Sequence, residues 1–342
     1  MYSVRILTDV DAWETLVQSR VYSPFVQSYK YGEFYKSLGE QYWIIGIFDH
    51  TNMLVGGSLI LTTHAKRGNF FYLPYGPKID PSNQVMVDAF TTFTLAFAKE
   101  QGMDFIRVSP LVKNSASAKA AAKRVGLRPA PMHVLAENTW MLDLTPAKDV
   151  LLAGMKKNHR NLIRRCEREG VRIEKHTNAE ALDMLHSMLD ETEKRHNFTR
   201  FSRKYINSEF AQFAEDDQAN IFISYLPDGT PDAAAIIMFY GNTAVYRHSA
   251  SLNIDKKIPT SYLIQWHVIQ EAKKRGMHWY NFWGVEPKEA GKNHPFAGIG
   301  HFKRGFGGFQ IDLLHCHDLP LTKKYWLNWM VEAFRSRKRG FS

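Results

Sequence analysis

The stretch Asn293 to Phe309, N-H-P-F-A-G-I-G-H-F-K-R-G-F-G-G-F, combines five glycines, four phenylalanines and the basic pair Lys303-Arg304. Phe302, Phe306 and Phe309 recur at spacings of four and three, which places them on one side of a helical turn and its exit. Lys303 then points away from that apolar side, and the glycines let a ligand approach closely. The segment predicts a lysine held as a point charge for a phosphate. A glycine-capped surface turn with a solvated lysine has the same local pattern.

Length and charge bound the class of protein. The chain has 342 residues, 44% of them hydrophobic, which exceeds the usual size of one domain and suffices for sizeable cores. The formal net charge of +10 favours RNA, anionic lipid surfaces or phosphate-bearing substrates as partners. Many basic proteins bind none of these, so the charge alone does not identify the partner.

Cysteine and histidine usage gives no sign of a metal site. Cys166 and Cys316 lie far apart in the sequence and lack metal-ligand spacing, as is typical of reduced thiols in a cytosolic protein. A cluster of four histidines lacks acidic partners at metal-binding spacing, so we expect no metal and no other cofactor. These histidines are His294, His301, His315 and His317.

The compartment follows from what the sequence lacks. The first ten residues show no signal-peptide pattern, and no window holds 18 apolar residues. We therefore expect a cytoplasmic protein without a transmembrane segment. A membrane-linked substrate would be met from the cytoplasmic side, through peripheral contact.

Strands and helices alternate along the first half of the chain. Period-2 patterns and turn residues predict strands, and Ser or Asp starts with helical periodicity predict helices. The expected strands are residues 2–7, 41–48, 53–63, 70–73, 104–108 and 138–144, and the expected helices are residues 9–20, 28–36, 81–101 and 115–125.

The second half repeats this order of elements approximately, and each half resembles one acetyltransferase-like (GNAT-type) domain. We therefore predict an α/β (α+β) protein with two tandem GNAT-like domains, each a mixed central sheet flanked by helices. The expected domains are residues 1–145 with a C-terminal amphipathic helix from residue 318, and residues 146–317. The further elements are strands 171–176, 219–226, 233–240, 244–250, 279–283 and 309–314, and helices 178–196, 202–214 and 259–275.

Coenzyme A binding is not expected despite this fold. An acetyl-CoA enzyme needs a glycine-rich loop of backbone N–H groups after its central strand to hold the pyrophosphate. The corresponding stretch from Tyr246 to Tyr262 contains Lys256, Lys257 and Pro259 but no glycine.

A basic helix joins the two halves at Met155 to Glu169. Four basic residues fall on one of its sides and apolar residues on the other. Such a stripe can follow the phosphates of a tRNA acceptor arm, and a solvated basic face has the same pattern. The four residues are Lys157, Arg160, Arg164 and Arg168.

Two motifs carry a family resemblance. The first is Phe302-Lys303 followed by Gly-Phe-Gly-Gly, after His-Pro and a short spacer; the second is W-M-L-D-L at 140–144 followed by M-K-K-N-H-R-N-L-I-R at 155–164. Both resemble the FemABX family, which moves an amino acid from aminoacyl-tRNA onto a peptidoglycan precursor. The resemblance covers nearly the whole chain, and the short span between residues 196 and 202 matches the compact type that lacks a coiled-coil arm.

The resemblance implies roles for particular residues. Phe302 and Lys303 would lie beside the tRNA 3′ end, where a fixed cation stabilises the departing ribose oxygen. Many relatives have an acidic residue where this chain has Ser109, so we favour proton transfer assisted by the substrate over a dedicated carboxylate base. A UDP-linked or lipid-linked muropeptide would be held by Lys36, Thr199, Arg200, Arg203, Tyr205, Tyr246 and Tyr262.

Three alternatives remain open on the sequence. The first is an N-acyltransferase of the same fold that uses coenzyme A, and the second is a non-catalytic RNA-binding module. The third is aminoacyl transfer to a lipid, a protein or a small metabolite. The sequence does not name the amino acid that is transferred.

Overall fold

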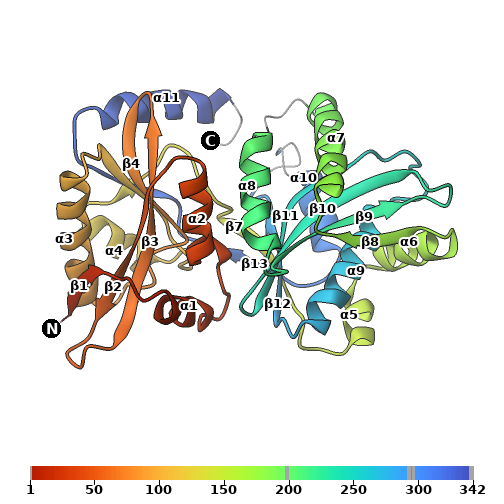
Figure 1. Ribbon diagram of the computed structural model, residues 1–342, viewed down its shortest axis with the longest axis horizontal. Helices are drawn as coiled ribbons and strands as arrows, with labels where there is room; N and C mark the ends of the chain where they lie inside the picture. Colours follow the sequence, from red (N-terminus) through yellow and green to blue (C-terminus); the bar gives the residue numbers. More distant parts are fainter. Residues whose placement is uncertain (1, 197–199, 291–293, 295–296, 339–342) are drawn as a thin grey trace.

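The computed structural model describes residues 2–196, 200–290, 294 and 297–338. Two seven-stranded sheets lie side by side, each with helices on both faces (Figure 1). The predicted mixed α/β architecture with two sheets is confirmed.

The first sheet is built mainly from the first half of the chain. Its faces are covered by α3 (Gln84–Glu100) and α4 (Ala116–Arg124) on one side and by α1 (Val10–Gln18) and α2 (Tyr29–Ser37) on the other. β4 and β5 pair in parallel, and the other neighbours pair antiparallel. In sheet order the strands are β1 (Ser3–Ile6), β2 (Tyr42–Phe48), β3 (Leu54–Ala65), β4 (Gly68–Pro74), β5 (Phe105–Ser109), β14 (His317–Pro320) and β6 (Arg128–Pro129).

The second sheet has the same size and one parallel pair, β11 with β12. That pair is bonded over three residue pairs, from Thr243–Trp279 to Val245–Asn281, and the two strands then separate. The strands in order are β13 (Phe309–Asp312), β7 (Asn138–Asp143), β12 (Trp279–Gly284), β11 (Thr243–Ser251), β10 (Pro231–Tyr240), β9 (Ala219–Tyr225) and β8 (Arg172–His176).

Helices cover the second sheet in two groups. One face packs on α5 (Lys148–Gly154), α6 (Lys157–Arg168) and α9 (Ser261–Lys274). The other face packs on α7 (Ala179–His196) and α8 (Arg203–Ala214). The remaining helices are η1 (Phe25–Gln27), α10 (Ala297–Arg304) and α11 (Tyr325–Lys338).

Helix starts follow the side chains that cap them. Each capping oxygen accepts a hydrogen bond from the backbone N–H three residues on, which satisfies a donor that the helix leaves free. The caps are Asp9 for α1, Ser28 for α2, Asn83 for α3, Ser115 for α4 and Ser202 for α8.

A shared core joins the two sheets. One apolar cluster contains residues of α1 and α2 together with residues of α7, α8 and β10. α2 lies antiparallel to α8, because the Phe34 and Tyr205 rings are 4.9 Å apart while Lys30 Nζ donates to the Gln212 carbonyl at 3.1 Å. Asn242 Nδ2 donates to the Arg20 carbonyl at 3.0 Å, across the same boundary.

The structure corrects the sheet to which one expected strand belongs and the start of the final helix. Residues 138–143, which we placed in the first half, pair between β12 and β13 of the second sheet. The final helix begins at Tyr325 and not at Asp318, because residues 317–320 form β14 against β5. The Asp318 carboxylate accepts hydrogen bonds from Arg107 on β5, an ion pair between residues far apart in sequence. The domain boundary itself stays a prediction.

Candidate functional site

The candidate site lies where β11 and β12 separate. Lys303, near the end of α10, reaches into this gap and contacts both strands. Its Nζ donates to the Gly284 carbonyl of β12 at 2.7 Å and lies 5.9 Å from the centre of the Tyr246 ring of β11. One lysine therefore bridges two strands whose own pairing has ended.

Lys303 is buried and easily deprotonated. Its side chain is 6% exposed. Burial lowers the pKa of Lys303 to about 7, and Glu286 opposes that effect in part. An ammonium has three protons to donate, and among the described residues Nζ has one hydrogen-bond acceptor, the Gly284 carbonyl. The ammonium form therefore keeps donor capacity that no acceptor among the described residues uses.

Aromatic rings hold the turn that carries Lys303. The Phe302 ring lies 4.9 Å from Tyr262 and 5.2 Å from Phe306, which is fully buried. His159 Nε2 donates to the Phe302 carbonyl at 2.9 Å. Phe302 and Phe306 share the predicted apolar side, but Phe309 does not: it belongs to β13 and is 40% exposed, because the chain leaves the helix after Arg304.

Two glycines of this turn are required by their neighbours. A Cβ at Gly305 would lie 1.9 Å from the His159 ring. Gly308 has φ +97°, and a Cβ there would lie 2.1 Å from the Met141 carbonyl oxygen. Close approach and left-handed backbone both favour glycine, so these glycines let the turn pack on α6 and β7.

An acidic residue that the sequence pattern did not single out lies beside Lys303. Glu286 forms an ion pair with Arg304, and its Oε2 is buried without a hydrogen-bond partner among the described residues. A Cβ at Gly300 would clash with this carboxylate. Glu286 lies two residues after the end of β12, so its nearness to α10 depends on tertiary packing.

Of the residues expected to hold the acceptor, Tyr246 lies on β11 and Tyr262 on α9, whereas the other described ones lie near the end of α2 and the start of α8. Lys36 lies in the last turn of α2, with its side chain 65% exposed and its Nζ 3.5 Å from Glu33 Oε1. The Tyr205 ring stacks on Phe201 at 4.5 Å and contacts Phe34 of α2. Figure 1 shows α2 and α8 facing each other across the boundary between the two sheets. Thr199 lies outside the described residues.

Arg200 and Arg203 differ in availability. Both pair with Asp190. The Arg200 side chain is 13% exposed and also contacts Glu193, whereas that of Arg203 is 49% exposed. Arg203 is therefore the arginine of the two that is better placed to reach a diphosphate.

A buried charged cluster connects this region to the gap between β11 and β12. Arg247 of β11 forms an ion pair with Glu209 of α8 at 2.9 Å, and His248 donates to the same carboxylate at 2.8 Å. Burial would raise the pKa of Glu209, but Arg247 and His248 outweigh it and lower that pKa to about 2.

Trp283 continues this connection toward Lys303. The Arg247 guanidinium lies 5.2 Å from the centre of the Trp283 ring, and Trp283 directly precedes the Gly284 carbonyl that accepts from Lys303. Trp283 has φ +67°, a conformation that is rare for a bulky residue. In the sequence, the adjacent Arg247 and His248 in the middle of an apolar strand are the pattern that could have indicated this cluster.

The basic helix is confirmed as a helix, but its four basic side chains differ in exposure and in hydrogen bonding. Lys157, Arg164 and Arg168 are exposed on α6. Arg160 instead donates to the carbonyls of Ala153 and Met155 at the end of α5. It therefore caps a neighbouring helix, which competes with a role at a phosphate.

A carboxylate from β10, that of Asp232, lies at the start of α9. A coenzyme A pyrophosphate would bind at this helix start in an acetyltransferase. Asp232 is fully buried and accepts from the Thr260 hydroxyl at 2.5 Å and from the Ile254 N–H at 2.8 Å. An anion is repelled by a fixed carboxylate at such a helix end. This arrangement agrees with the missing glycine-rich loop.

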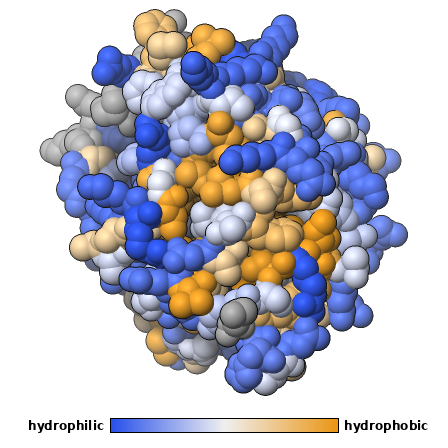
Figure 2. All heavy atoms as spheres, turned by 90° about the vertical axis from the view of Figure 1, so that its left-hand side faces the viewer, coloured by the Kyte–Doolittle hydropathy of each residue, from blue (hydrophilic) through white to orange (hydrophobic). Residues whose placement is uncertain are grey.

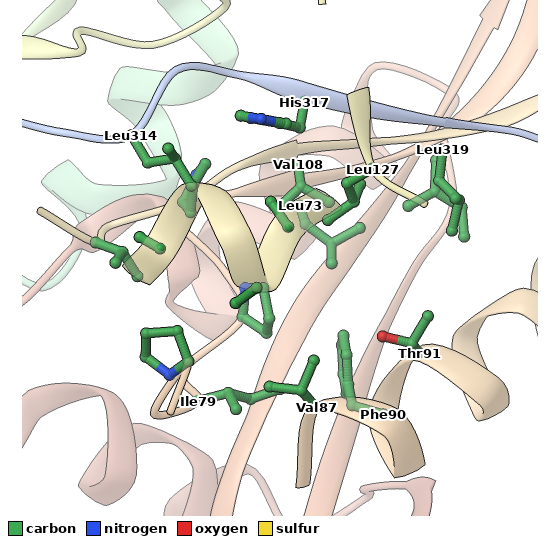
Figure 3. A pocket seen from close by; sticks show the side chains of 18 of the residues that line it. Leu73, Ile79, Val87, Phe90, Thr91, Val108, Leu127, Leu314, His317 and Leu319 are labelled. Carbon is green, nitrogen blue, oxygen red and sulfur yellow. The ribbon is translucent and has the colours of Figure 1, made fainter. Parts of the chain in front are cut away.

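Elsewhere the molecule offers an apolar hollow without catalytic groups. Figure 2 shows apolar side chains around it on the outer face of the first-sheet half, and Figure 3 shows α3 and α4 on its two sides. The cavity measures about 120 Å³. Its lining is mostly aliphatic, with Thr91, Thr94 and His317 as the polar members, so we do not place a reaction there.

The described residues contain neither a metal-binding cluster nor a helix that could span a membrane. No group of three His, Cys, Asp or Glu side chains there is arranged to hold a metal ion. Within that same part of the chain, no helix has the length and apolar character needed to cross a membrane. Cys166 and Cys316 are buried free thiols, and burial raises the pKa of each to about 12.

Comparisons with known proteins cover almost the whole chain. The model of the FemAB family matches residues 8–125, 132–229 and 216–332. Lipid II:glycine glycyltransferases from two strains of Staphylococcus epidermidis are each 18% identical over 335 residues, covering 78% of this chain and 80% of theirs.

Two solved structures show the fold. A crystal structure of FemX superposes with a TM-score of 0.84 at 17% identity, covering 96% of this chain and 100% of that one. A tandem GNAT protein from the clavulanic acid biosynthesis pathway gives a TM-score of 0.57 at 12% identity, covering 94% and 98%. The predicted tandem GNAT-like arrangement is confirmed.

Proposed function

The chain belongs to the FemAB family, and from that premise we propose that it is an aminoacyltransferase acting on a peptidoglycan precursor. It moves an amino acid from aminoacyl-tRNA to the amine of the precursor's stem peptide and so builds an interpeptide bridge. The relatives named lipid II:glycine glycyltransferase support this reaction class. Charged tRNA is a cytoplasmic substrate, so the proposal places the transfer in the cytoplasm.

The observation that carries the proposal is the buried Lys303 between β11 and β12, whose ammonium can donate more hydrogen bonds than the one it makes to a described residue, Gly284. The acceptor nitrogen bonds to the ester carbonyl carbon, and the bond from that carbon to the ribose oxygen breaks. The proton lost by the amine ends on the ribose hydroxyl. The Lys303 ammonium donates to the oxygen on which negative charge develops, which lowers the barrier.

The pKa of Lys303 suits this task. With a pKa lowered to about 7 by burial, the amine and the ammonium are both populated near neutral pH, so proton transfer in either direction is feasible. A tRNA phosphate placed nearby would favour the charged form. Phe302 fixes the turn through its contacts with Tyr262 and His159.

The acceptor is assigned to the surface between α2 and α8. Lys36 and Arg203 supply exposed charges for its diphosphate, and Tyr205 supplies a ring face and a hydroxyl between α2 and α8. Tyr246 lies instead beside Lys303, where it would meet the reacting end of the acceptor. Tyr262 contacts Phe302 and His159, so its part is to position the lysine turn. A UDP-linked and a lipid-linked muropeptide share this diphosphate chemistry, and the assay below separates them.

Coenzyme A is the donor of the competing proposal. The tandem GNAT likeness concerns the fold, and fold alone does not decide function. The Asp232 carboxylate at the start of α9 argues against a pyrophosphate there. Acceptors other than peptidoglycan would use the same lysine, and a lack of product with both muropeptides would point to such an acceptor.

The test incubates the purified chain with individually charged tRNAs and either UDP-MurNAc-pentapeptide or lipid II. Product mass identifies the amino acid and the acceptor. We expect one charged tRNA to extend one of the acceptors by the mass of one residue, and RNase pretreatment to abolish the product.

Lys303→Met is the matched inactive variant, because methionine conserves the volume of the buried stem. Acetyl-CoA replaces charged tRNA in a parallel reaction. Product from acetyl-CoA, or equal product from wild type and Lys303→Met, would overturn the proposal.

A further inference from the structure

The last described helix, α11, turns four large apolar residues to solvent, while Tyr325 and several polar residues pack on the protein. Asn328 and Ser336 are 5% and 7% exposed. Glu332 receives two hydrogen bonds from Arg107 of β5, at 3.0 and 2.7 Å. Four large apolar side chains on the other side are exposed: Trp326 43%, Leu327 50%, Met330 57% and Phe334 71%.

These four side chains form one continuous face. At 3.6 residues per turn they fall within an arc of about 100° around the helix axis. Lys323, just before the helix, and Arg337, in its last turn, lie on the same arc and are exposed. The one acidic residue of the helix sequence, Glu332, is turned inward to Arg107. The exposed face is thus apolar in the middle and basic at both ends.

We propose that this face of α11 docks on an anionic phospholipid surface. Trp326, Leu327, Met330 and Phe334 would enter the boundary between headgroups and acyl chains, while Lys323 and Arg337 contact lipid phosphates. An amphipathic helix with an aromatic apolar face and basic flanks binds in the interface plane in this way. The helix lies along the upper edge of the first-sheet half in Figure 1, open to an approaching surface.

Charge argues against a second copy of this chain as the occupant. In an antiparallel self-contact Lys323 of one copy meets Arg337 of the other, and in a parallel contact each residue meets itself. Both arrangements bring like charges together, which is unfavourable at an interface. Four side chains of one helix also provide far less than the roughly 800 Å² per partner of a typical stable interface. An anionic surface, by contrast, attracts the basic residues at both ends of the face, Lys323 and Arg337.

The inference does not rest on the transfer reaction, so its test needs no activity. The full chain is sedimented with vesicles of phosphatidylcholine alone and of phosphatidylcholine with phosphatidylglycerol at 7:3. We expect binding to the anionic vesicles that weakens as salt is raised, with a blue shift of tryptophan emission. Met330→Glu/Phe334→Glu should lower the partition coefficient by roughly tenfold or more.

Two further variants make the test specific. Met53→Glu/Val85→Glu changes two equally exposed apolar residues, 63% and 62%, on other elements and should bind like wild type. Lys323→Glu/Arg337→Glu should lose the preference for anionic vesicles. Phe334→Ser, at the most exposed of the four positions, gives a milder second variant of the face, and circular dichroism checks its helix content.

Two results would overturn the inference. One is wild-type binding to anionic vesicles no stronger than that of Met330→Glu/Phe334→Glu. The other is a wild-type dimer, seen by light scattering after gel filtration, that this variant alone abolishes without any vesicle binding. The second result would assign the face to another copy of the chain.

Discussion

Lys303 combines a chemical role with a cost to the fold. Burial lowers its pKa to about 7 from an ordinary value of 10.5, so the folded protein binds this proton more weakly than the unfolded chain does. Between these two pKa values the unfolded state holds more protons, and stability therefore rises with pH. Below about pH 7 both states are protonated and the full cost of the buried charge remains.

Lys303→Met should therefore change activity and stability in opposite directions. Loss of one donor at a developing oxyanion lowers kcat by about 10²–10³-fold. The free energy of unfolding at pH 7 should rise by on the order of 2–4 kcal/mol, because each pKa unit corresponds to about 1.4 kcal/mol. Urea unfolding from pH 6 to pH 10 measures this: the wild type should approach the variant as pH rises. A constant difference across that range would contradict the assigned pKa.

Lys36→Ala should act on the acceptor alone. The Lys36 side chain is 65% exposed, and among the described residues its ion-pair partner is Glu33 alone, so the fold does not depend on it. A phosphate contact that is equal in ground and transition states changes KM and leaves kcat unchanged. We expect KM for the muropeptide to rise about tenfold, measured by steady-state kinetics at saturating charged tRNA. A fall in kcat with unchanged KM would remove Lys36 from the acceptor site.

The surroundings of a residue were predictable from the sequence where neighbours within one short segment determine them. The glycines and phenylalanines around Lys303 indicated an anchored lysine, and the structure places it between two strands. Glu209 and Arg247 escaped prediction because α8 and β11, which carry them, meet only through the packing of the second-sheet half. A glutamate on the apolar stripe of α8, beside Ile206 and Phe210, was the available sign.

At the scale of elements, the structure shows which residues of the basic helix α6 are suitable for testing RNA binding. Arg160 is occupied by the carbonyls at the end of α5, so its replacement would disturb α5 as well as any RNA contact. Lys157 and Arg164 are exposed, and the described residues offer them no ion pair. Reversing the charges of Lys157 and Arg164 therefore tests RNA binding without disturbing α5, as a change at Arg160 would.

Lys157→Glu/Arg164→Glu should weaken the binding of charged tRNA. If both side chains meet phosphates, the slope of log affinity against log salt should fall in magnitude by about 1.8, or 0.9 for each phosphate. The KM for the acceptor should not change. Binding titrations at several salt concentrations measure the slope, with Lys119→Glu/Lys123→Glu on α4 as the matched reversal on the other half. Equal slopes for both variants would make the α6 stripe a solvated face.

Element prediction failed where pairing partners lie far apart in the sequence. Residues 317–320 continue toward an amphipathic helix, so local periodicity assigned them to it. Their partners are β5 and β6, about 200 residues earlier, and these pairings make β14 a strand. Strand pairing of that range is invisible to a local pattern. The caps at Ser28, Ser115 and Ser202 were predictable because each bond spans three residues.

At the scale of the whole molecule, the two sheets behave as one packed body. The largest apolar cluster includes Trp13 and Phe34 from the first half with Phe210 and Met238 from the second. Asn242 binds backbone carbonyls of Arg20 and Val21 at 3.0 Å each, across the same boundary. The proposed acceptor surface between α2 and α8 depends on this packing, because each half supplies one of the two helices.

Unfolding should therefore show a single transition, and Glu209→Gln should move all of it. The Arg247 side chain is 4% exposed, so losing its carboxylate leaves a buried charge without its counterion, which costs about 3–5 kcal/mol. Asp88→Asn, which breaks the exposed ion pair with Arg124, should cost less than about 1 kcal/mol. Calorimetry and urea unfolding of wild type and both variants measure these differences. Two separate transitions, of which Glu209→Gln shifts only one, would show that the halves unfold independently and that the α2–α8 surface can open without the rest.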